Sequence, residues 1–150
     1  MRIGLMENVP ILKEKLIREK AKHPFGKEIA VESLRQEARY DLILSDKAYF
    51  PSPFPCRADL FFIPGGTKVA EIPEEGILLT GGMAHSDSVS FSSIGEAEAM
   101  LCVQQEICIA GKNVFPFEKR VPFDRNFSLY KNLATGFALS LAEILFTEEL

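Results

Sequence analysis

The amino-acid sequence predicts an α/β protein with a small Rossmann-like layered fold. Two apolar runs, 59–66 and 76–82, each end in a glycine pair. Short apolar runs without polar alternation are typical of strands buried on both faces of a parallel sheet. Helical spacing of apolar residues marks 10–22 and 126–146. We therefore expect a mainly parallel sheet of about four or five short strands flanked by helices, with a long C-terminal helix.

The first half of the chain begins with an expected strand at 2–6. A proline then suits the first turn of a helix over 10–22, because proline lacks an N–H that would stay unpaired there. The charged stretch 13–22 is interpreted as the solvated face of this helix. Residues 28–39 fit either a strand start or a helix, and the helix is favoured. A buried strand is expected at 40–45.

The stretch 47–56 carries prolines at three alternate positions. Proline excludes a helix interior and cannot donate a ladder hydrogen bond, so this stretch is predicted to be an extended, stiff loop. Its aromatic part, 49–55, either forms a wall over a ligand site or covers the edge of the sheet with Phe50 and Phe54. Both interpretations stay open.

The segment after the second glycine pair is expected to contain a further strand at 88–92. Ser93 and Glu96 then match a capping box, in which serine caps a helix and glutamate occupies its third position. This pattern predicts a helix from 93 towards 110, apolar on most sides and therefore buried. The alternative is a hairpin within 107–115, since short apolar runs fit both structures.

The C-terminal segment is predicted to be irregular or an edge strand over 116–124, and helical over 126–146. Large apolar residues recur every fourth position beside a ridge of alanines, and small side chains let another helix approach closely. A homodimer is the natural closed form for such a surface. The expected contact residues are Leu133, Ala134, Phe137, Ala138, Leu141, Ala142 and Leu145.

Length and charge limit the functional classes. The chain of 150 residues, 47% hydrophobic, fits a single α/β domain spanning 1–150. Its net charge of −4 argues against binding to nucleic acid, which normally requires a basic patch. The apolar segment 133–146 is too short to span a bilayer, and the first residues lack the apolar region of a signal peptide. Three cysteines without framework spacing favour a reducing compartment, so we expect a cytoplasmic protein with no membrane contact.

The stretch 81–93 is the strongest candidate for a binding site. Glycine turns at the carboxyl ends of parallel strands are the usual place for ligands. A helix that starts at Ser93 would also offer free N–H groups and a positive dipole end to a small anion. The expected ligand-binding residues are Gly81, Gly82, Ser92, Ser93 and Gly95, with Gly65 and Gly66 as neighbours across the sheet. The alternative is that Ser93 only caps its helix.

Catalytic chemistry has weaker support. His85 and Asp87 lie in the same polar stretch, but no serine at the next positions suits both partners of a triad. The segment 59–66 resembles one strand and turn of the class I amidotransferase-like and DJ-1-like families, which use a cysteine nucleophile after a later strand. Residues 80–85 contain no cysteine, so that chemistry is not carried over.

Metal and cofactor motifs are not found in the sequence. It contains neither a complete dinucleotide-binding glycine motif nor a phosphate-binding loop, and we predict no cofactor. The cysteines and two histidines lack the spacing of a metal site, so the cysteines are interpreted as core residues. Glu71, Glu74 and Glu75 are interpreted as a solvated turn.

Three functions fit these features. The first is a ligand-binding, accessory or regulatory module that takes a small anion. The second is a small transferase or hydrolase that acts at the 81–93 turn. The third is a structural protein that uses its C-terminal helix to bind a partner.

Overall fold

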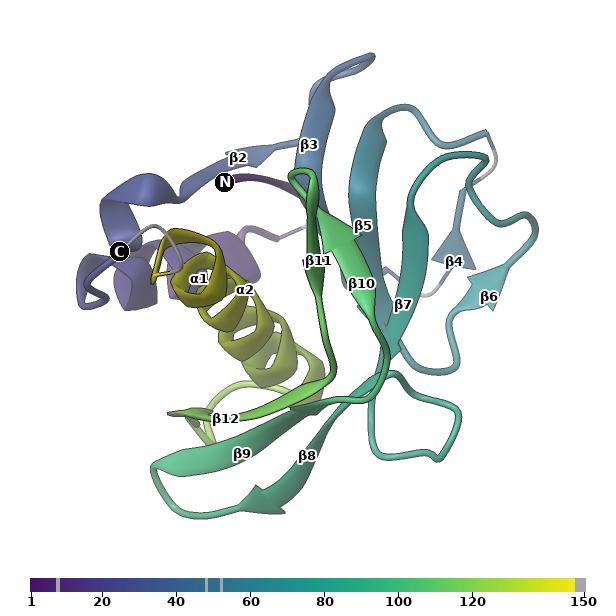
Figure 1. Cartoon of the computed structure of the whole chain (residues 1–150). Helices are drawn as coiled ribbons and strands as arrows, with labels where there is room; N and C mark the ends of the chain where they lie inside the picture. The colour runs from purple at the N-terminus through teal and green to yellow at the C-terminus, as the bar shows by residue number, and fades with distance from the viewer. Residues whose placement is uncertain (8, 48, 52, 148–150) are drawn as a thin grey trace.

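The computed structural model describes residues 1–7, 9–47, 49–51 and 53–147. Over these residues the main element is an eight-stranded mixed sheet, accompanied by two α-helices and two small two-stranded sheets (Figure 1). The strand order of the main sheet is β12-β9-β8-β7-β5-β3-β1-β2. The expected Rossmann-like sheet of four or five strands flanked by helices is therefore wrong, because strands dominate the chain and the sheet is mixed.

One half of the sheet is parallel and was largely expected from the sequence. It consists of β1 (Arg2–Met6), β2 (Ala30–Ser33), β3 (Arg39–Ser45), β5 (Arg57–Pro64) and β7 (Ile77–Gly81). The helix α1 (Ile11–Ala21) connects β1 to β2. The favoured helix over 28–39 is wrong: a short 3₁₀ turn (Gly26–Glu28) leads into β2, which pairs parallel with β1.

The other half is antiparallel and replaces the expected helix over 93–110. It consists of β8 (Val89–Ile94), β9 (Glu98–Val103) and β12 (Phe117–Pro122), and it joins the parallel half where Gly81 of β7 pairs with Val89 of β8. The alternative hairpin is confirmed as β10 (Ile107–Ile109) and β11 (Lys112–Val114). Strand β12 is the edge strand expected within 116–124.

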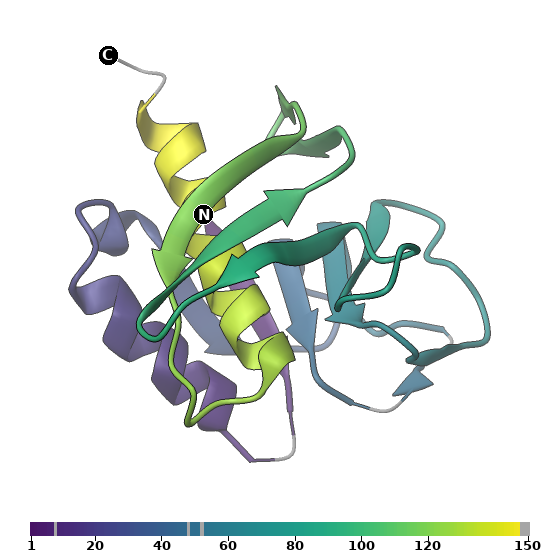
Figure 2. The same ribbon diagram turned by 90° about the horizontal axis from the view of Figure 1, so that it is seen from below.

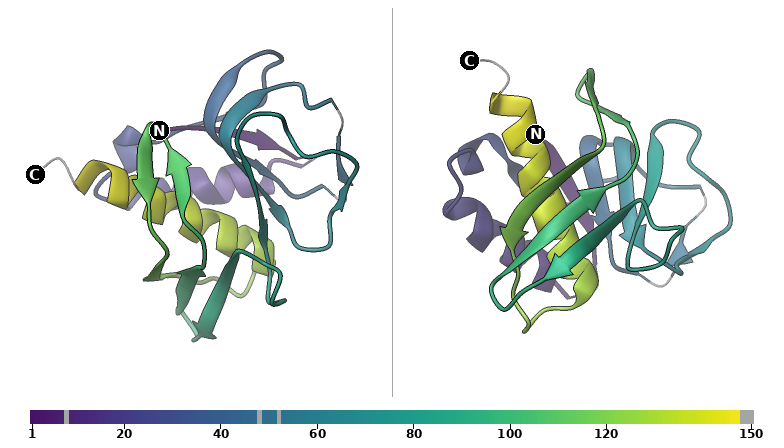
Figure 3. Two further views of the ribbon diagram at one scale, coloured as in Figure 1. Left: turned by 45° about the vertical axis from the view of Figure 1, so that its right-hand side comes forward. Right: turned by 60° about the horizontal axis from the view of Figure 1, so that its bottom comes forward.

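Both helices lie on the same side of the sheet (Figures 1 and 2). The sheet curves so that its antiparallel half crosses α2 (Leu129–Thr147), and the β10–β11 hairpin stands beside the same helix (Figure 3). The lysine Lys112 of this hairpin donates from Nζ to the carbonyl oxygen of Leu145 at 3.0 Å. Helix α2 is therefore enclosed by the fold and forms the centre of the larger core.

The second face of the parallel half carries a smaller core without a helix. Phe50, Phe61 and Ile63 belong to this cluster. The connections from β3 to β5 and from β5 to β7 are loops, and they pair through β4 (Tyr49–Phe50) and β6 (Lys68–Val69). The proline-rich sequence of the first loop explains this cover, because it cannot form the helix usual in parallel crossovers.

The seven residues expected at a dimer contact are all buried within the single chain. Their exposed fractions are 0%, except for 4% at Leu145. They pack against the sheet and against α1, so they are core residues and are not available to a second copy. The apolar pattern correctly indicated burial, but the covering surface is the chain's own sheet. No helix in the described part of the chain is long and apolar enough to cross a membrane.

Candidate functional site

The two glycine turns lie side by side at the carboxyl ends of β5 and β7, and a buried carboxylate separates them. Gly65 donates its N–H to the carbonyl oxygen of Gly81 at 2.8 Å. Asp87 is 5% exposed, and its Oδ2 accepts a hydrogen bond from the N–H of Ala84 at 3.0 Å. A Cβ added at Gly65 or at Gly82 would lie 2.5 Å from a carboxylate oxygen of Asp87. The glycines therefore make room for Asp87, and this negative charge disfavours an anion between the turns.

The remaining residues of the expected site do not converge on these turns. Ser92 and Ser93 lie towards the far end of β8, and Gly95 lies in the β8–β9 turn, where its N–H donates to the carbonyl oxygen of Glu98. An extended strand rises about 3.3 Å per residue, so Ser93 is roughly 13 Å along the strand from the residue that pairs with Gly81. The helix N-terminus expected at Ser93 is absent from this segment, which is a strand and a turn. The anion site predicted there therefore lacks the helix end on which the prediction depended.

The two weak catalytic candidates also point to different environments. His85 is exposed, whereas Asp87 is buried between the glycine turns. They therefore do not form an acid–base pair that faces a common substrate.

The helix N-terminus nearest to this edge is already neutralised. Both carboxylate oxygens of Glu7 accept hydrogen bonds from the start of α1, from Leu12 N–H and from Lys13 N–H, each at 2.9 Å. This side chain occupies the position in which a helix end would bind an external anion. At the carboxyl ends of the parallel strands, backbone N–H groups thus donate to the chain's own carboxylates, Glu7 and Asp87.

The aromatic loop covers the second face of the sheet. Phe50 is 2% exposed; it stacks on Phe54 and meets Phe61 edge-on. This arrangement supports the interpretation that Phe50 and Phe54 pack over the sheet. Ser52 of this loop lies outside the described residues. The loop also borders a cavity of about 310 Å³ over the amino end of β5, where Glu71, Glu74 and Glu75 form the opposite wall.

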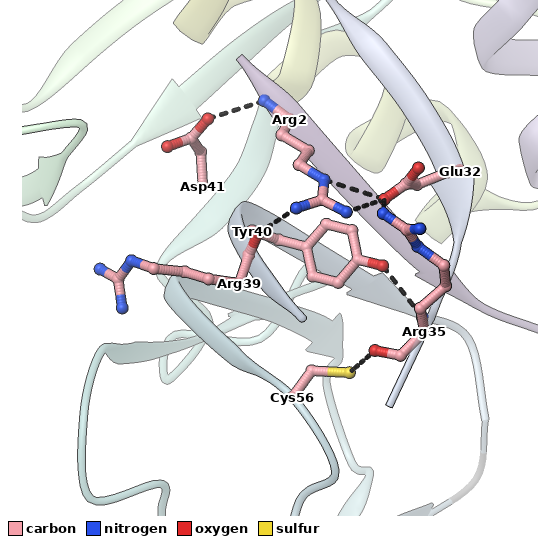
Figure 4. Close-up of polar contacts among 7 residues, drawn as sticks. All are labelled: Arg2, Glu32, Arg35, Arg39, Tyr40, Asp41 and Cys56. Atoms are coloured by element: carbon pink, nitrogen blue, oxygen red, sulfur yellow. Dashed lines mark hydrogen bonds and ion pairs between the residues drawn. The ribbon is translucent and has the colours of Figure 1, made fainter. Parts of the chain in front are cut away.

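A polar cluster beside this face is fully engaged in structural contacts (Figure 4). The guanidinium of Arg2 lies 4.6 Å from the centre of the Tyr40 ring and donates to Glu32 Oε1. This hydrogen bond lowers the pKa of the Glu32 carboxyl group. The thiol of Cys56 donates to the carbonyl oxygen of Arg35 at 3.0 Å, and burial raises its pKa. A thiol in this state is a poor nucleophile, so the cluster fixes the turn before β3 and offers no reactive group.

The chemically most unusual residue is Lys15 on α1. Its side chain is 2% exposed, yet no carboxylate of the described residues lies within 4 Å of its Nζ. The Nζ atom instead lies 4.7 Å from the centre of the Phe127 ring. Buried lysine is rare without an ion-pair partner, because removing an ammonium group from water is costly. The contact with Phe127 offsets part of this cost.

Lys15 borders an open cleft of about 520 Å³, within the size range of ligand pockets. We call it the Lys15 cleft. Figure 2 shows its setting, where the loop between β12 and α2 passes beside α1. Three segments contribute side chains: α1 with Lys15, Glu19 and Lys22, the β8–β9 turn with Glu96 and Ala97, and the loop at 122–126.

The charges around the Lys15 cleft explain the state of its lysine. Burial is the largest effect and lowers the pKa of Lys15 below its ordinary value of 10.5. Glu19 and Asp124 raise this pKa, whereas Arg18 and Lys22 lower it. Glu19 is also 3.8 Å from the ammonium group of Lys22, and Asp124 Oδ1 accepts the N–H of Asn126. The two nearest acidic groups therefore have other partners, and Lys15 is left without a dedicated counter-ion.

A second hollow of about 270 Å³ adjoins the Lys15 cleft, and the two share Glu19, Lys22 and Pro122. Ser140 on α2 borders this hollow, and its buried Oγ has no hydrogen-bond partner among the described residues. Unsatisfied buried polar atoms are uncommon in folded proteins. The buried lysine and this unsatisfied hydroxyl group thus border two neighbouring hollows.

Sequence reasoning missed Lys15 because it treated the stretch 13–22 as a solvated face. A signal was present: Lys15 lies three residues after Leu12 and next to Leu16, on the face that both leucines bury. A lysine at an apolar position of a helix was the available clue. No protein-family model, no curated protein and no solved structure matches this chain.

Proposed function

We propose that this protein is a ligand-binding module and that a small anionic molecule binds in the Lys15 cleft. The observation that supports the proposal best is Lys15 itself, a lysine of 2% exposure that borders a cleft and has no carboxylate within 4 Å in the described structure. An anion would complete the missing ion pair in a site of reduced dielectric, where such a contact is stronger than in water. Lys22 and Arg125 border the same cleft and add positive charge, which offsets the negative charge of Glu19, Glu96 and Asp124 in the lining.

This proposal places the binding site in the Lys15 cleft and not at the glycine turns. The ligand class remains the small anion that the sequence predicts. An enzyme at the 81–93 turn has little support, since His85 is exposed and Asp87 is enclosed. A partner-binding C-terminal helix has little support either, because α2 is buried along most of its length.

The test is a titration of the protein with propionate, succinate and inorganic phosphate, followed by calorimetry and by thermal unfolding. We expect at least one of these anions to bind and to raise the melting temperature, since a ligand at about 100 times its Kd stabilises the folded state by about 2.7 kcal/mol. Affinity should fall as the pH rises and Lys15 loses its proton.

The matched variants are Lys15→Met and Lys27→Met. The first removes the buried charge, and the second removes an exposed lysine that does not border the cleft. Binding should be lost in the first variant and retained in the second. Binding that survives Lys15→Met, or no binding by any of the three anions, would overturn the proposal.

A further inference from the structure

We propose that the bound anion carries a carbonyl group, and that Lys15 Nζ forms an imine with its carbonyl carbon. This inference rests on the proposed function, because it assigns the chemistry of the ligand in the same cleft. It also goes beyond binding, since it makes Lys15 a covalent attachment point. The ligand class is a small 2-oxo acid, in which the carbonyl group is adjacent to the carboxylate.

The position of Lys15 favours attack by its amine. The ammonium form is stabilised in proteins mainly by carboxylates and water, and Lys15 has neither a carboxylate within 4 Å in the described structure nor more than 2% exposure. Its surroundings therefore raise the fraction of neutral amine at a given pH above that of an exposed lysine, in agreement with a pKa that burial lowers. Buried lysines of this kind serve as nucleophiles towards carbonyl compounds because the free lone pair is the reactive form.

The cleft also offers a place for the carboxylate of a 2-oxo acid. Lys22 and Arg125 border the cleft from two different segments, and both side chains are exposed towards solvent. We therefore expect the carboxylate of a ligand held at Lys15 to face these two cations, which border the same cleft.

The step is balanced without an added oxidant or reductant. The lone pair of the neutral amine attacks the carbonyl carbon and forms a C–N bond. The carbonyl oxygen then leaves as water, and the two hydrogens of this water come from the amine. Glu19, Asp124 and Glu96 border the cleft, so carboxylates are at hand to carry these protons.

The test is reductive trapping. The full chain is incubated with pyruvate and cyanoborohydride, digested, and mapped by mass spectrometry. Reduction of the imine leaves a stable adduct equal in mass to pyruvic acid less one oxygen atom. We expect the yield at Lys15 to exceed the yield at the exposed Lys27 by at least about tenfold, because only Lys15 combines an uncompensated amine with a cleft.

Two comparisons separate imine formation from simple anion binding. Propionate carries the charge of pyruvate without the carbonyl carbon next to it, so its affinity should fall with rising pH while the trapping yield rises. The charged groups that face Lys15 in this range are Glu19, Arg18 and Lys22 on α1, Asp124 and Arg125 in the loop, and Glu96 in the β8–β9 turn. Lys15→Arg keeps the positive charge but has no primary amine, so it should bind propionate and give no adduct.

Each result decides between the two proposals. An adduct concentrated at Lys15 supports the inference. Equal labelling of Lys15 and Lys27, or an unlabelled Lys15 in protein that binds propionate, overturns the inference and leaves the proposed function standing. An unlabelled Lys15 in protein that binds only succinate or phosphate likewise overturns the inference alone. If pyruvate does not react at Lys15 and none of propionate, succinate and phosphate binds at the Lys15 cleft, both proposals fail.

Discussion

At the scale of single residues, Lys15 combines a destabilising buried charge with a place beside the cleft in which we propose that a ligand binds. It is buried together with Leu12 and Leu16 on α1, while its charge lacks a carboxylate partner among the described residues. Replacing a buried charge by an apolar side chain of similar volume is often stabilising. A residue that weakens the fold but borders a cleft is typical of a functional site.

We expect Lys15→Met to raise the free energy of unfolding at neutral pH by about 1–3 kcal/mol, because methionine fills the space without a charge. Burial lowers the folded-state pKa of Lys15 below 10.5, so the unfolded chain binds more protons between the two values. Wild-type stability therefore increases with pH across this range, and the advantage of the variant shrinks. Urea unfolding at neutral pH and at about pH 10 measures both effects.

The control for this prediction is Lys27→Met, which removes an exposed charge and should change stability by less than about 0.5 kcal/mol at either pH. A destabilised Lys15→Met variant would show that the contact with Phe127 outweighs the cost of burial.

At the scale of elements, the strands of the parallel half were predictable and those of the antiparallel half were not. Strand β5 contains the apolar run 60–63 and is followed by a glycine pair, and β7 begins with an apolar run and ends at Gly81; such runs are typical of buried parallel strands. In β9, Ala99, Leu101 and Val103 face the core, but the alternate positions Met100 and Cys102 are also apolar. Apolar residues at consecutive positions remove the alternation that identifies a half-buried strand. The resulting pattern resembles that of a buried helix.

The candidate site was predictable only in part, for a related reason. The glycine turns could be located from the sequence, since strand ends are marked by local patterns. The Lys15 cleft depends on a helix near the N-terminus meeting the β8–β9 turn and the loop after β12. Such contacts between distant segments follow from the topology, and the sequence pattern at 93–110 predicts a helix where the chain forms strands.

The turns themselves give a prediction about Asp87. We expect Gly82→Ala to destabilise the protein by about 1–3 kcal/mol, because the new methyl group would lie 2.5 Å from the buried carboxylate. Gly66→Ala should cost about 1–2 kcal/mol for a different reason: its φ is +84°, and no atom lies within 4 Å of an added Cβ. Denaturant unfolding of each variant measures these costs.

The two substitutions are distinguished by combining each with Asp87→Ala. The cost of Gly82→Ala should fall sharply in that background, whereas the cost of Gly66→Ala should stay the same. Equal behaviour of the two glycines in this double-mutant cycle would mean that Asp87 does not determine the need for glycine at 82.

At the scale of the whole molecule, the fold is a curved sheet around one apolar helix. The parallel half carries α1 and α2 on one side, and the antiparallel half crosses α2 (Figures 1 and 2). This arrangement explains a helix that is apolar nearly all round in a chain of modest size. It also explains why a surface that looked suited to a second copy is enclosed by the chain's own strands.

The position of α2 predicts that Ala138→Glu unfolds the chain. Ala138 is 0% exposed, and a glutamate there would place an unpaired carboxylate in the larger core. Substitutions of this kind exceed about 4 kcal/mol, a large share of the roughly 5–15 kcal/mol that stabilises a domain. Thr147→Glu adds the same charge at the exposed end of the same helix and should fold normally. Near-ultraviolet circular dichroism and sedimentation measure the outcome: a folded Ala138→Glu monomer beside a dimeric wild type would show that α2 is an interface after all.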